Sequence, residues 1–394
     1  YANFLVKDCL KLSAGDKLFI IGSEFILDFI SIVIEEAKEL GIEKIETLIN
    51  HQEDQRELYL TKSYEEIIRS PLMDRRKYND MAKKGYAFLN IYSPIPNFFQ
   101  EVDKELLNKV LKYQMESISE YRKYQGKGLI KWNISAVPND IWAKNIEGIH
   151  SLEELWNYIF DICLINEADP GIAWNKKLAK LKNRAEYLNR LKIDKLIYTN
   201  SLGTNLEIGL PENYLFQSAE GKNIVNMPTE EVFTSPNRLR INGIVYSSKP
   251  LLHNGVLIKD FYLKFKDGKI TEYKAKEGEE ILKGIIETDE GSKYLGEVAL
   301  VDDNSPISNT NIIFKNTLFD ENSTCHLAIG DSFPECIKNG LEKSKEELLN
   351  LGLNQSKTHV DFFIGTKDLN VVAVLQNGEY LDIMKKGNFI KEEF

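Results

Sequence analysis

The segment 358–365, which reads Thr-His-Val-Asp-Phe-Phe-Ile-Gly, places a histidine and a carboxylate close together. It has the alternation of a β-strand, so His359 and Asp361 share one face, whereas Val360 and Phe362 share the other and point into a core. An imidazole and a carboxylate that project from a rigid strand form half of a site for zinc, cobalt or manganese. A hydrogen-bonded His/Asp pair at a sheet edge is the simpler alternative.

Two other segments carry a chemically active side chain among apolar neighbours. His326 follows Ser-Thr-Cys and precedes Leu-Ala-Ile-Gly, which suits either a metal ligand or a histidine satisfied within the core. Glu297 lies in Gly-Glu-Val-Ala-Leu-Val. A carboxylate in a buried strand is costly unless a cation, a proton or hydrogen-bond donors compensate it. That compensation comes from a metal ion or, alternatively, from Lys293.

Two adjacent acids occupy a loop between Pro228 and Pro236. The loop begins Met-Pro-Thr-Glu-Glu and ends Val-Phe-Thr-Ser-Pro, and prolines at both ends favour a rigid extended loop over a helix. Glu230 and Glu231 then face different directions, so that one can bind a metal while the other carries protons. A solvated acidic loop is the alternative.

The four segments together supply two histidines, an aspartate and two or three glutamates, none from a shared helix. That set suits a dinuclear hydrolytic site, in which two ions bracket one water. The sequence contains no HExxH, P-loop, GxSxG or EF-hand pattern and no well-placed GxGxxG. The missing motifs exclude the enzymes that depend on them, but not a metal site assembled from scattered ligands.

The first half of the chain alternates strand-like and helix-like patterns. Short apolar runs at 17–21, 45–49 and 86–92 are expected to be strands, and apolar residues at helical spacing over 29–40 end before Gly41. Strands that alternate with helices predict a parallel sheet with helical crossovers.

A domain boundary is expected after two further helices. Ser-Leu-Glu-Glu at 151–154 is a capping-box pattern that opens a helix through about Cys163, and a second helical stretch covers 177–191. The pattern then changes to short β-rich runs. We therefore expect an α/β N-terminal domain over residues 1–192 and a metal-binding catalytic domain over 193–394.

The predicted second domain is α+β and rich in antiparallel strands. Its β-rich runs lie at 204–208, 242–248, 255–265 and 269–273. Asp267-Gly268 between the last two is a strong signal for a two-residue hairpin.

Composition limits the possible partners and location. The 394 residues carry a formal charge of −10, which argues against nucleic acid and anionic membranes as partners. The basic cluster Lys176, Lys177 and Lys180 is interpreted as a solvated helix face. The N-terminus lacks a signal-peptide pattern, and no apolar stretch approaches the roughly 20 residues that span a bilayer. We therefore expect a cytoplasmic protein.

The four cysteines fit this location. Cys9, Cys163, Cys325 and Cys336 lie far apart without a CxxC pair, which suits neither a disulfide framework nor a zinc finger. Buried free thiols in a reducing compartment are the expectation.

Five motifs together resemble the thermophilic aminopeptidases, peptidase family M29, of the aminopeptidase T and aminopeptidase S type. They occur in the family's order and at similar separations. The motifs are Asn226–Pro236, Ser247–Pro250, Gly296–Ala299, Cys325–Ala328 and His359–Phe362. The likeness covers nearly the whole chain and is densest in the C-terminal half.

The resemblance implies a set of metal ligands. Carried over by position, they are Glu231, Glu297, His326, His359 and Asp361. Five protein ligands for two divalent ions (Zn, Co, Mg or Mn) require that at least one carboxylate bridges the ions.

The resemblance also implies a reaction and an assembly. A water activated between the ions would attack the first peptide carbonyl of a peptide with a free N-terminus, and Glu230 would be the general base. The N-terminal domains of a homodimer would enclose the site and limit access to short or unfolded peptides.

One position departs from the family pattern. The tyrosine expected seven residues after the ligand histidine is Phe333 here, which has no oxygen for metal or oxyanion. Losing one such donor costs roughly 10²–10³ in rate, unless Ser332 or a water replaces it. The alternative function is therefore a metal-binding homologue with weak or no catalysis. A dinuclear hydrolase acting on another amide, such as a carboxypeptidase or amidohydrolase, and a purely structural dimer are further alternatives.

Overall fold

The strands and helices fall into two compact units, which we describe separately. In this computed structural model, the described residues are 1–218, 223–253 and 256–390. The first unit is Tyr1–Trp174, with a later segment that contains β8 (Asn226–Met227), and the second unit is the rest of the chain.

The first unit is built on a parallel sheet of five strands. Every residue of its interior strand β1 except Lys17 is buried, as expected for a strand covered by helices on both faces. The order across the sheet is β2 (Lys44–Asn50), β1 (Lys17–Ser23), β3 (Ala87–Tyr92), β4 (Trp132–Ala136) and β8.

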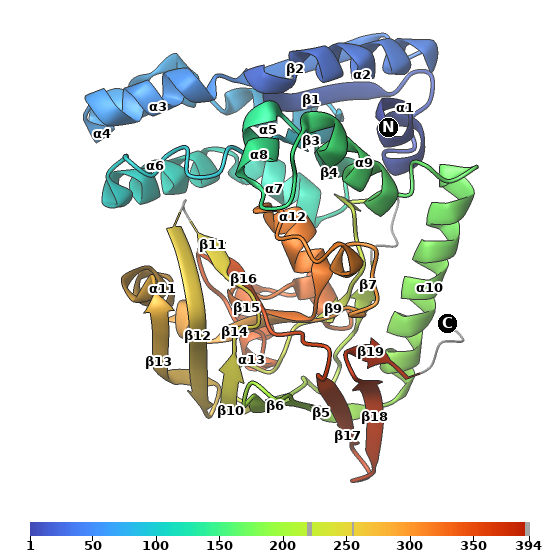
Figure 1. The fold of residues 1–394 in the computed structure, drawn as a ribbon, viewed down its shortest axis with the longest axis vertical. Coiled ribbons are helices and arrows are strands. Elements are labelled where there is room, and N and C mark those ends of the chain that lie inside the picture. The colour runs from blue at the N-terminus through green and yellow to red at the C-terminus, as the bar shows by residue number, and fades with distance from the viewer. Residues whose placement is uncertain (219–222, 254–255, 391–394) are drawn as a thin grey trace. The chain divides into compact units, whose positions relative to one another are not determined.

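Helices connect these parallel strands, which confirms the predicted crossovers. In Figure 1, α2 (Leu27–Glu39) lies on one side of the sheet and α5 (Arg76–Lys83) on the other, whereas α8 (Asp140–Asn145) contacts α9 (Leu152–Ile162). The other helices of this unit are α1 (Ala2–Phe4), α3 (Gln52–Thr61), α4 (Tyr64–Arg69), α6 (Lys104–Ser117) and α7 (Ser119–Gly126).

The predicted cap of α9 forms, with one difference. The Ser151 hydroxyl accepts the N–H of Glu154 at 3.0 Å. The Glu154 carboxylate accepts the N–H of His150 at 2.8 Å instead of that of Ser151. The helix therefore begins where the sequence indicates.

The second unit contains a nine-stranded sheet. At the predicted hairpin, Asp267 and Gly268 both have positive φ (49° and 83°), as a type I′ turn requires. Gly255, the first residue of the strand predicted over 255–265, lies outside the described residues. The strands are β5 (Ile193–Thr199), β6 (Asn205–Gly209), β10 (Ile241–Tyr246), β11 (Leu251–His253), β12 (Val256–Lys266), β13 (Lys269–Glu277), β17 (Asn370–Leu375), β18 (Tyr380–Lys385) and β19 (Asn388–Phe389).

A second, five-stranded antiparallel sheet lies in the same unit. Its order is β16 (His359–Phe363), β15 (His326–Gly330), β14 (Leu295–Leu300), β9 (Val232–Thr234) and β7 (Gln217–Ser218). The helices of this unit are most of α10 (Pro170–Arg190), α11 (Glu279–Ile286), α12 (Thr317–Asp320) and α13 (Lys345–Asn350), and the short helix η6 (Glu321–Ser323) follows α12 directly.

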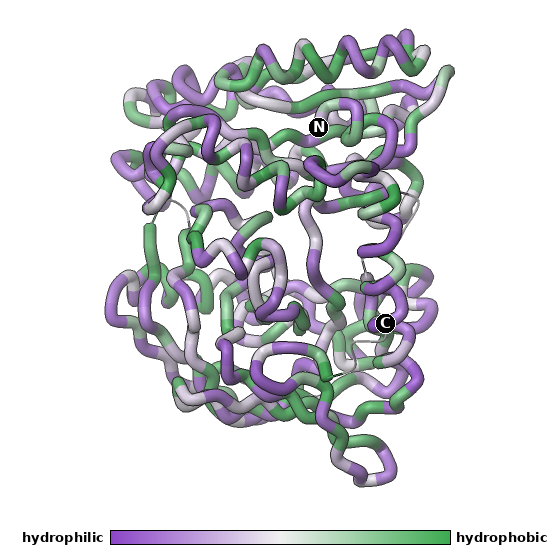
Figure 2. Tube along the Cα trace, turned by 45° about the vertical axis from the view of Figure 1, so that its right-hand side comes forward, coloured by the Kyte–Doolittle hydropathy of each residue, from purple (hydrophilic) through white to green (hydrophobic). Residues whose placement is uncertain are grey.

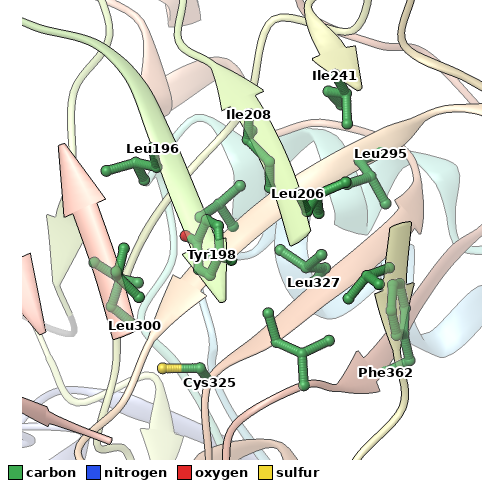
Figure 3. Close-up of a cluster of buried hydrophobic side chains, with 14 of the residues drawn as sticks. Leu196, Tyr198, Leu206, Ile208, Ile241, Leu295, Leu300, Cys325, Leu327 and Phe362 are labelled. Atoms are coloured by element: carbon green, nitrogen blue, oxygen red, sulfur yellow. The ribbon is translucent and has the colours of Figure 1, made fainter. Parts of the chain in front are cut away.

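The core of the second unit lies between its two sheets. Leu196 and Leu206 from the nine-stranded sheet share one buried cluster with Leu300, Leu327 and Phe362 from the five-stranded sheet. Figure 3 shows these side chains directed toward one another. One face of the five-stranded sheet is thus committed to the core. The parallel and antiparallel sheets together confirm the predicted fold class.

The boundary between the units lies earlier than the one placed at 192/193. The structure divides the chain after Trp174, inside the continuous helix α10. A sequence pattern marks the end of a helix but not a division within it. The return of β8 to the first sheet has no local signal either, because its pairing with β4 is long-range.

Hydrophobic residues are spread along the whole trace. Figure 2 shows no long uninterrupted hydrophobic stretch, only short ones alternating with hydrophilic residues. Among the described residues, no helix has the length and apolar character needed to cross a membrane. The four cysteines are buried free thiols, as expected.

Candidate metal centre

The face of the five-stranded sheet that does not enter the core carries the predicted ligands. Strand register places Glu297 opposite Ala328, and Ala328 opposite Asp361 on the next strand. His326 lies opposite Ala299. Because side chains alternate between faces, these five residues project to one side. The alanines between the larger side chains leave space above the middle strands.

The remaining two predicted ligands lie on the same face, one at the start of β16 and the other just before β9. His359 begins β16 opposite Gly330, and Glu231 directly precedes β9. Glu231 is 8% exposed and Glu297 5% exposed. The structure therefore brings all five predicted ligands together.

The ligand atoms form two groups that share one residue. One group consists of Glu231, Glu297 and His326, and the other of Glu297, His359 and Asp361. Within each group, the possible ligand atoms all lie within 4.8 Å of one another. Glu297 is thus the residue common to both groups, each of which could hold a metal ion.

Each histidine is oriented by a backbone carbonyl. Nδ1 of His326 lies 3.1 Å from the Thr324 oxygen, and Nδ1 of His359 lies 2.8 Å from the Asp331 oxygen. A carbonyl only accepts, so each Nδ1 carries the proton. This arrangement leaves Nε2 as the ligand atom, as in many metal sites where a second hydrogen bond fixes the ring.

Both Nε2 atoms face carboxylates. His326 Nε2 lies 3.1 Å from Glu231 Oε2, and His359 Nε2 lies 2.9 Å from Glu297 Oε2 and 3.3 Å from Asp361 Oδ1. Glu231 Oε2 and Asp361 Oδ1 are fully enclosed, yet neither has a correctly aligned hydrogen-bond donor in the described part of the chain. Such oxygens are rare in folded proteins unless an ion or water satisfies them.

Electrostatics show how strongly the cluster needs positive charge. The pKa of Glu297 is raised to about 7, chiefly by burial and further by the charge of Asp361, although a hydrogen bond from His359 opposes the shift. Burial disfavours charge on His326, but the carboxylates of Glu231, Glu297 and Asp361 together outweigh this effect and raise the pKa of that histidine to about 10. Without a metal, protons hold the cluster together.

This chain is similar to known proteins over almost its whole length. Residues 1–389 match the family model of the thermophilic metalloproteases, M29. The chain belongs to this family. Aminopeptidase AmpS of Bacillus subtilis is 36% identical over 401 residues, which cover 99% of this chain and 97% of that protein. Aminopeptidase 2 of Geobacillus stearothermophilus is 34% identical, with 100% and 97% covered.

A solved structure agrees with the sequence relatives. Wild-type AmpT from Thermus thermophilus superposes with a TM-score of 0.90 at 28% identity, covering 99% of this chain and 98% of that one. The family and the names of these relatives confirm the predicted enzyme class, a metalloaminopeptidase.

A further acid of this M29 chain, Glu321, was missed by sequence reasoning. Burial raises its pKa well above the usual value, and the carboxylates of Asp361 and Glu231 raise it further. Glu321 therefore lies within electrostatic reach of both ligand groups. Its only signal in the sequence is its place in Asp-Glu-Asn shortly before His326, a turn with no periodicity.

The predicted base, Glu230, lies outside both ligand groups. Its carboxylate forms an ion pair with Lys177, and both side chains are almost buried, at 11% and 12% exposure. Lys177 therefore does not belong to a solvated helix face, and that interpretation was wrong for this residue. Lys180 does agree with it, being 46% exposed.

Phe333 packs where the family pattern has a tyrosine. Its ring centroid lies 4.9 Å from that of His359 and 5.4 Å from that of Phe233. Its N–H donates to the Ser235 hydroxyl at 3.0 Å. The neighbouring Ser332 hydroxyl accepts the N–H of Asn354. The ring thus presents no oxygen beside His359.

Proposed function

We propose that this M29 chain removes the first residue of peptides that have a free N-terminus, using two divalent ions. The observation that carries the proposal is the pair of ligand groups joined at Glu297. The ions would be held by Glu231, Glu297, His326, His359 and Asp361.

The donor set fits such ions. Two enclosed carboxylate oxygens, Glu231 Oε2 and Asp361 Oδ1, have no aligned donor among the described residues. Buried carboxylates repel one another unless a cation or protons compensate them. Imidazole nitrogens with carboxylate oxygens suit Zn, Co or Mn, and a carboxylate-rich set also admits Mg.

The chain's own residues divide the remaining work. Two bound cations would supply charge stabilisation for the developing oxyanion and a more acidic water. The charge of the bound cations would keep Glu321 ionised, so that it would take the proton of the attacking water and deliver it to the departing nitrogen. We assign this role to Glu321 rather than to Glu230, because Glu230 is engaged with Lys177. Glu230 would instead stabilise the loop that presents Glu231.

Assembly and location form the outer part of the proposal. The resemblance to M29 aminopeptidases supports a homodimer, and four buried free thiols support a cytoplasmic location. Light scattering after size-exclusion chromatography would test the dimer, and a particle of monomer mass would contradict it.

Hydrolysis after metal removal and replacement tests the function. The chelated protein should be inactive toward aminoacyl chromogenic substrates and regain activity with Co, Zn, Mg or Mn. An N-acetylated substrate should not be cleaved, since the free amine is part of what is recognised. Bound metal without turnover would favour the metal-binding homologue, and equal cleavage of the acetylated substrate would favour another amide hydrolase.

A further inference from the structure

The turn that carries Glu321 has little regular structure of its own. Helices α12 and η6 together span Thr317–Ser323, fewer than two helical turns. A helix this short is not stable by itself. The position of the Glu321 carboxylate therefore depends on the side chains that anchor the turn.

Two anchors lie on either side of Glu321. The buried Asp320 carboxylate accepts the N–H groups of Phe314 at 2.8 Å and Asn316 at 3.0 Å. The fully buried Asn322 side chain accepts the N–H of Glu230 at 2.9 Å. Asn322 thus connects the turn to the loop that presents the neighbouring ligand.

The third anchor reaches the turn from a separate loop. Ser323 is 1% exposed, and its hydroxyl donates to the Asp320 carbonyl at 2.5 Å. The same hydroxyl accepts a hydrogen bond from Lys249 Nζ at 2.7 Å. Two hydrogen bonds through the Ser323 hydroxyl therefore connect Lys249 Nζ to the backbone carbonyl of Asp320 in this turn.

The loop that carries Lys249 is itself fixed. The N–H of Ser248 donates to the Phe363 carbonyl, and the N–H of Ser247 donates to the Phe261 carbonyl, both at 2.8 Å. This loop therefore hydrogen-bonds to β16 of the five-stranded sheet and to β12 of the nine-stranded sheet. Lys249 is thus held at its base while its ammonium group contacts the turn.

The lysine is unusually placed for a side chain without a role. Lysines are mostly exposed, whereas Lys249 is only partly accessible. Burial lowers its pKa, and the carboxylates of Asp320 and Asp303 oppose that shift. Acids of the same region thus partly offset the cost of burying this charge.

We propose that Lys249 is a positioning residue for catalysis, which acts through Ser323 to hold the turn bearing Glu321. This inference rests on the proposed function. Within the described residues, Lys249 forms no hydrogen bond or ion pair with either ligand group, so its loss should slow turnover without releasing metal or weakening peptide binding.

Variants at Lys249 and Ser323 test this role. In K249M, kcat should fall by about 10- to 100-fold, the usual effect of losing a supporting contact, while KM and metal content stay unchanged. K249R, which keeps a donor, should recover part of the loss. The double variant K249M/S323A should lose no more than the larger single loss, because the two residues act as one unit. K276M is the matched control, since Lys276 is 74% exposed and pairs only with Asp260 in the described structure.

Hydrogen–deuterium exchange provides a readout that does not require activity. Amides of residues 317–323 should exchange faster in K249M than in the wild type, with no change in K276M. Unchanged kcat, or unchanged exchange in this turn, would overturn the proposal, as would metal loss in proportion to kcat. If K249M fails to fold, S323A decides by the same measurements. If the wild type cleaves no peptide, the proposed function fails, and the exchange result alone judges Lys249.

Discussion

The two faces of the five-stranded sheet do different work with alternate residues of the same strands. On β15, Leu327 and Ile329 enter the core, whereas His326 and Ala328 face the metal centre. One face removes apolar surface from water, and the other gathers imidazoles and carboxylates, of which the carboxylates repel one another unless a cation or protons compensate them. Neighbouring residues of one strand thus serve different purposes: one stabilises the core, and the next belongs to the candidate metal centre.

The strongest test of this separation removes the shared ligand. E297A should lower kcat/KM by more than about 10³-fold, since both cation sites lose a ligand and the transition state loses its charge stabilisation. The thermal unfolding temperature of the metal-free protein should not fall, because a buried acid has been removed from a cluster of carboxylates that repel one another. Activity above a tenth of the wild type would break the comparison.

The opposite face should show the reverse result. L327A removes a fully buried side chain from between the sheets and should lower the free energy of unfolding by about 2–5 kcal/mol. At a temperature where the protein stays folded, kcat should match the wild type. L341A is the control, because Leu341 is 56% exposed. A loss of kcat without loss of stability would contradict the division between faces.

Phe333 sharpens the comparison on the metal side. F333Y adds one hydroxyl next to His359 and should raise kcat by about 10- to 100-fold by supplying the missing oxyanion donor. F333L, which also lacks oxygen, is the control for altered packing. No gain in F333Y, with its metal content intact, would show that another group already fills the role.

The pH dependence of metal binding gives the smallest expected effect. Burial holds the pKa of Glu297 at about 7 in the metal-free chain, so a cation must displace a proton there. The Glu297 proton alone should raise affinity by about tenfold between pH 6 and pH 8, and the His326 proton, whose pKa is about 10, should make the rise steeper. Calorimetry in buffers of different ionisation enthalpy would count the protons released. Affinity independent of pH, or E297Q with the same pH slope, would contradict this assignment.

Much of the fold could be predicted because its signals are local. The alternation in 358–365 placed His359 and Asp361 on one face, and the Asp267-Gly268 turn indicated its hairpin. Both depend on neighbours in the chain. The strand pairing that sets Glu297 beside Ala328 connects segments far apart in the sequence. Only the resemblance to the M29 family therefore indicated that these segments belong to one site.

The parts of the site that were not predicted from the sequence also depend on long-range contacts. Glu321 lies on a turn whose position depends on Asn322, Ser323 and a distant lysine, none of which leaves a periodic pattern. Glu230 resembled a proton carrier by its adjacency to Glu231. The buried partner that occupies it, Lys177, is on another element and appeared in the sequence as part of a charged helix.

Counting bound metal in single ligand variants tests the shared-ligand geometry most directly. We expect two ions per chain in the wild type, one in H326A, one in D361A, and none held tightly in E297A, measured by elemental analysis after dialysis against a fixed free-metal concentration. A protein that binds one ion, or an E297A variant that retains two, would contradict the bridging role of Glu297.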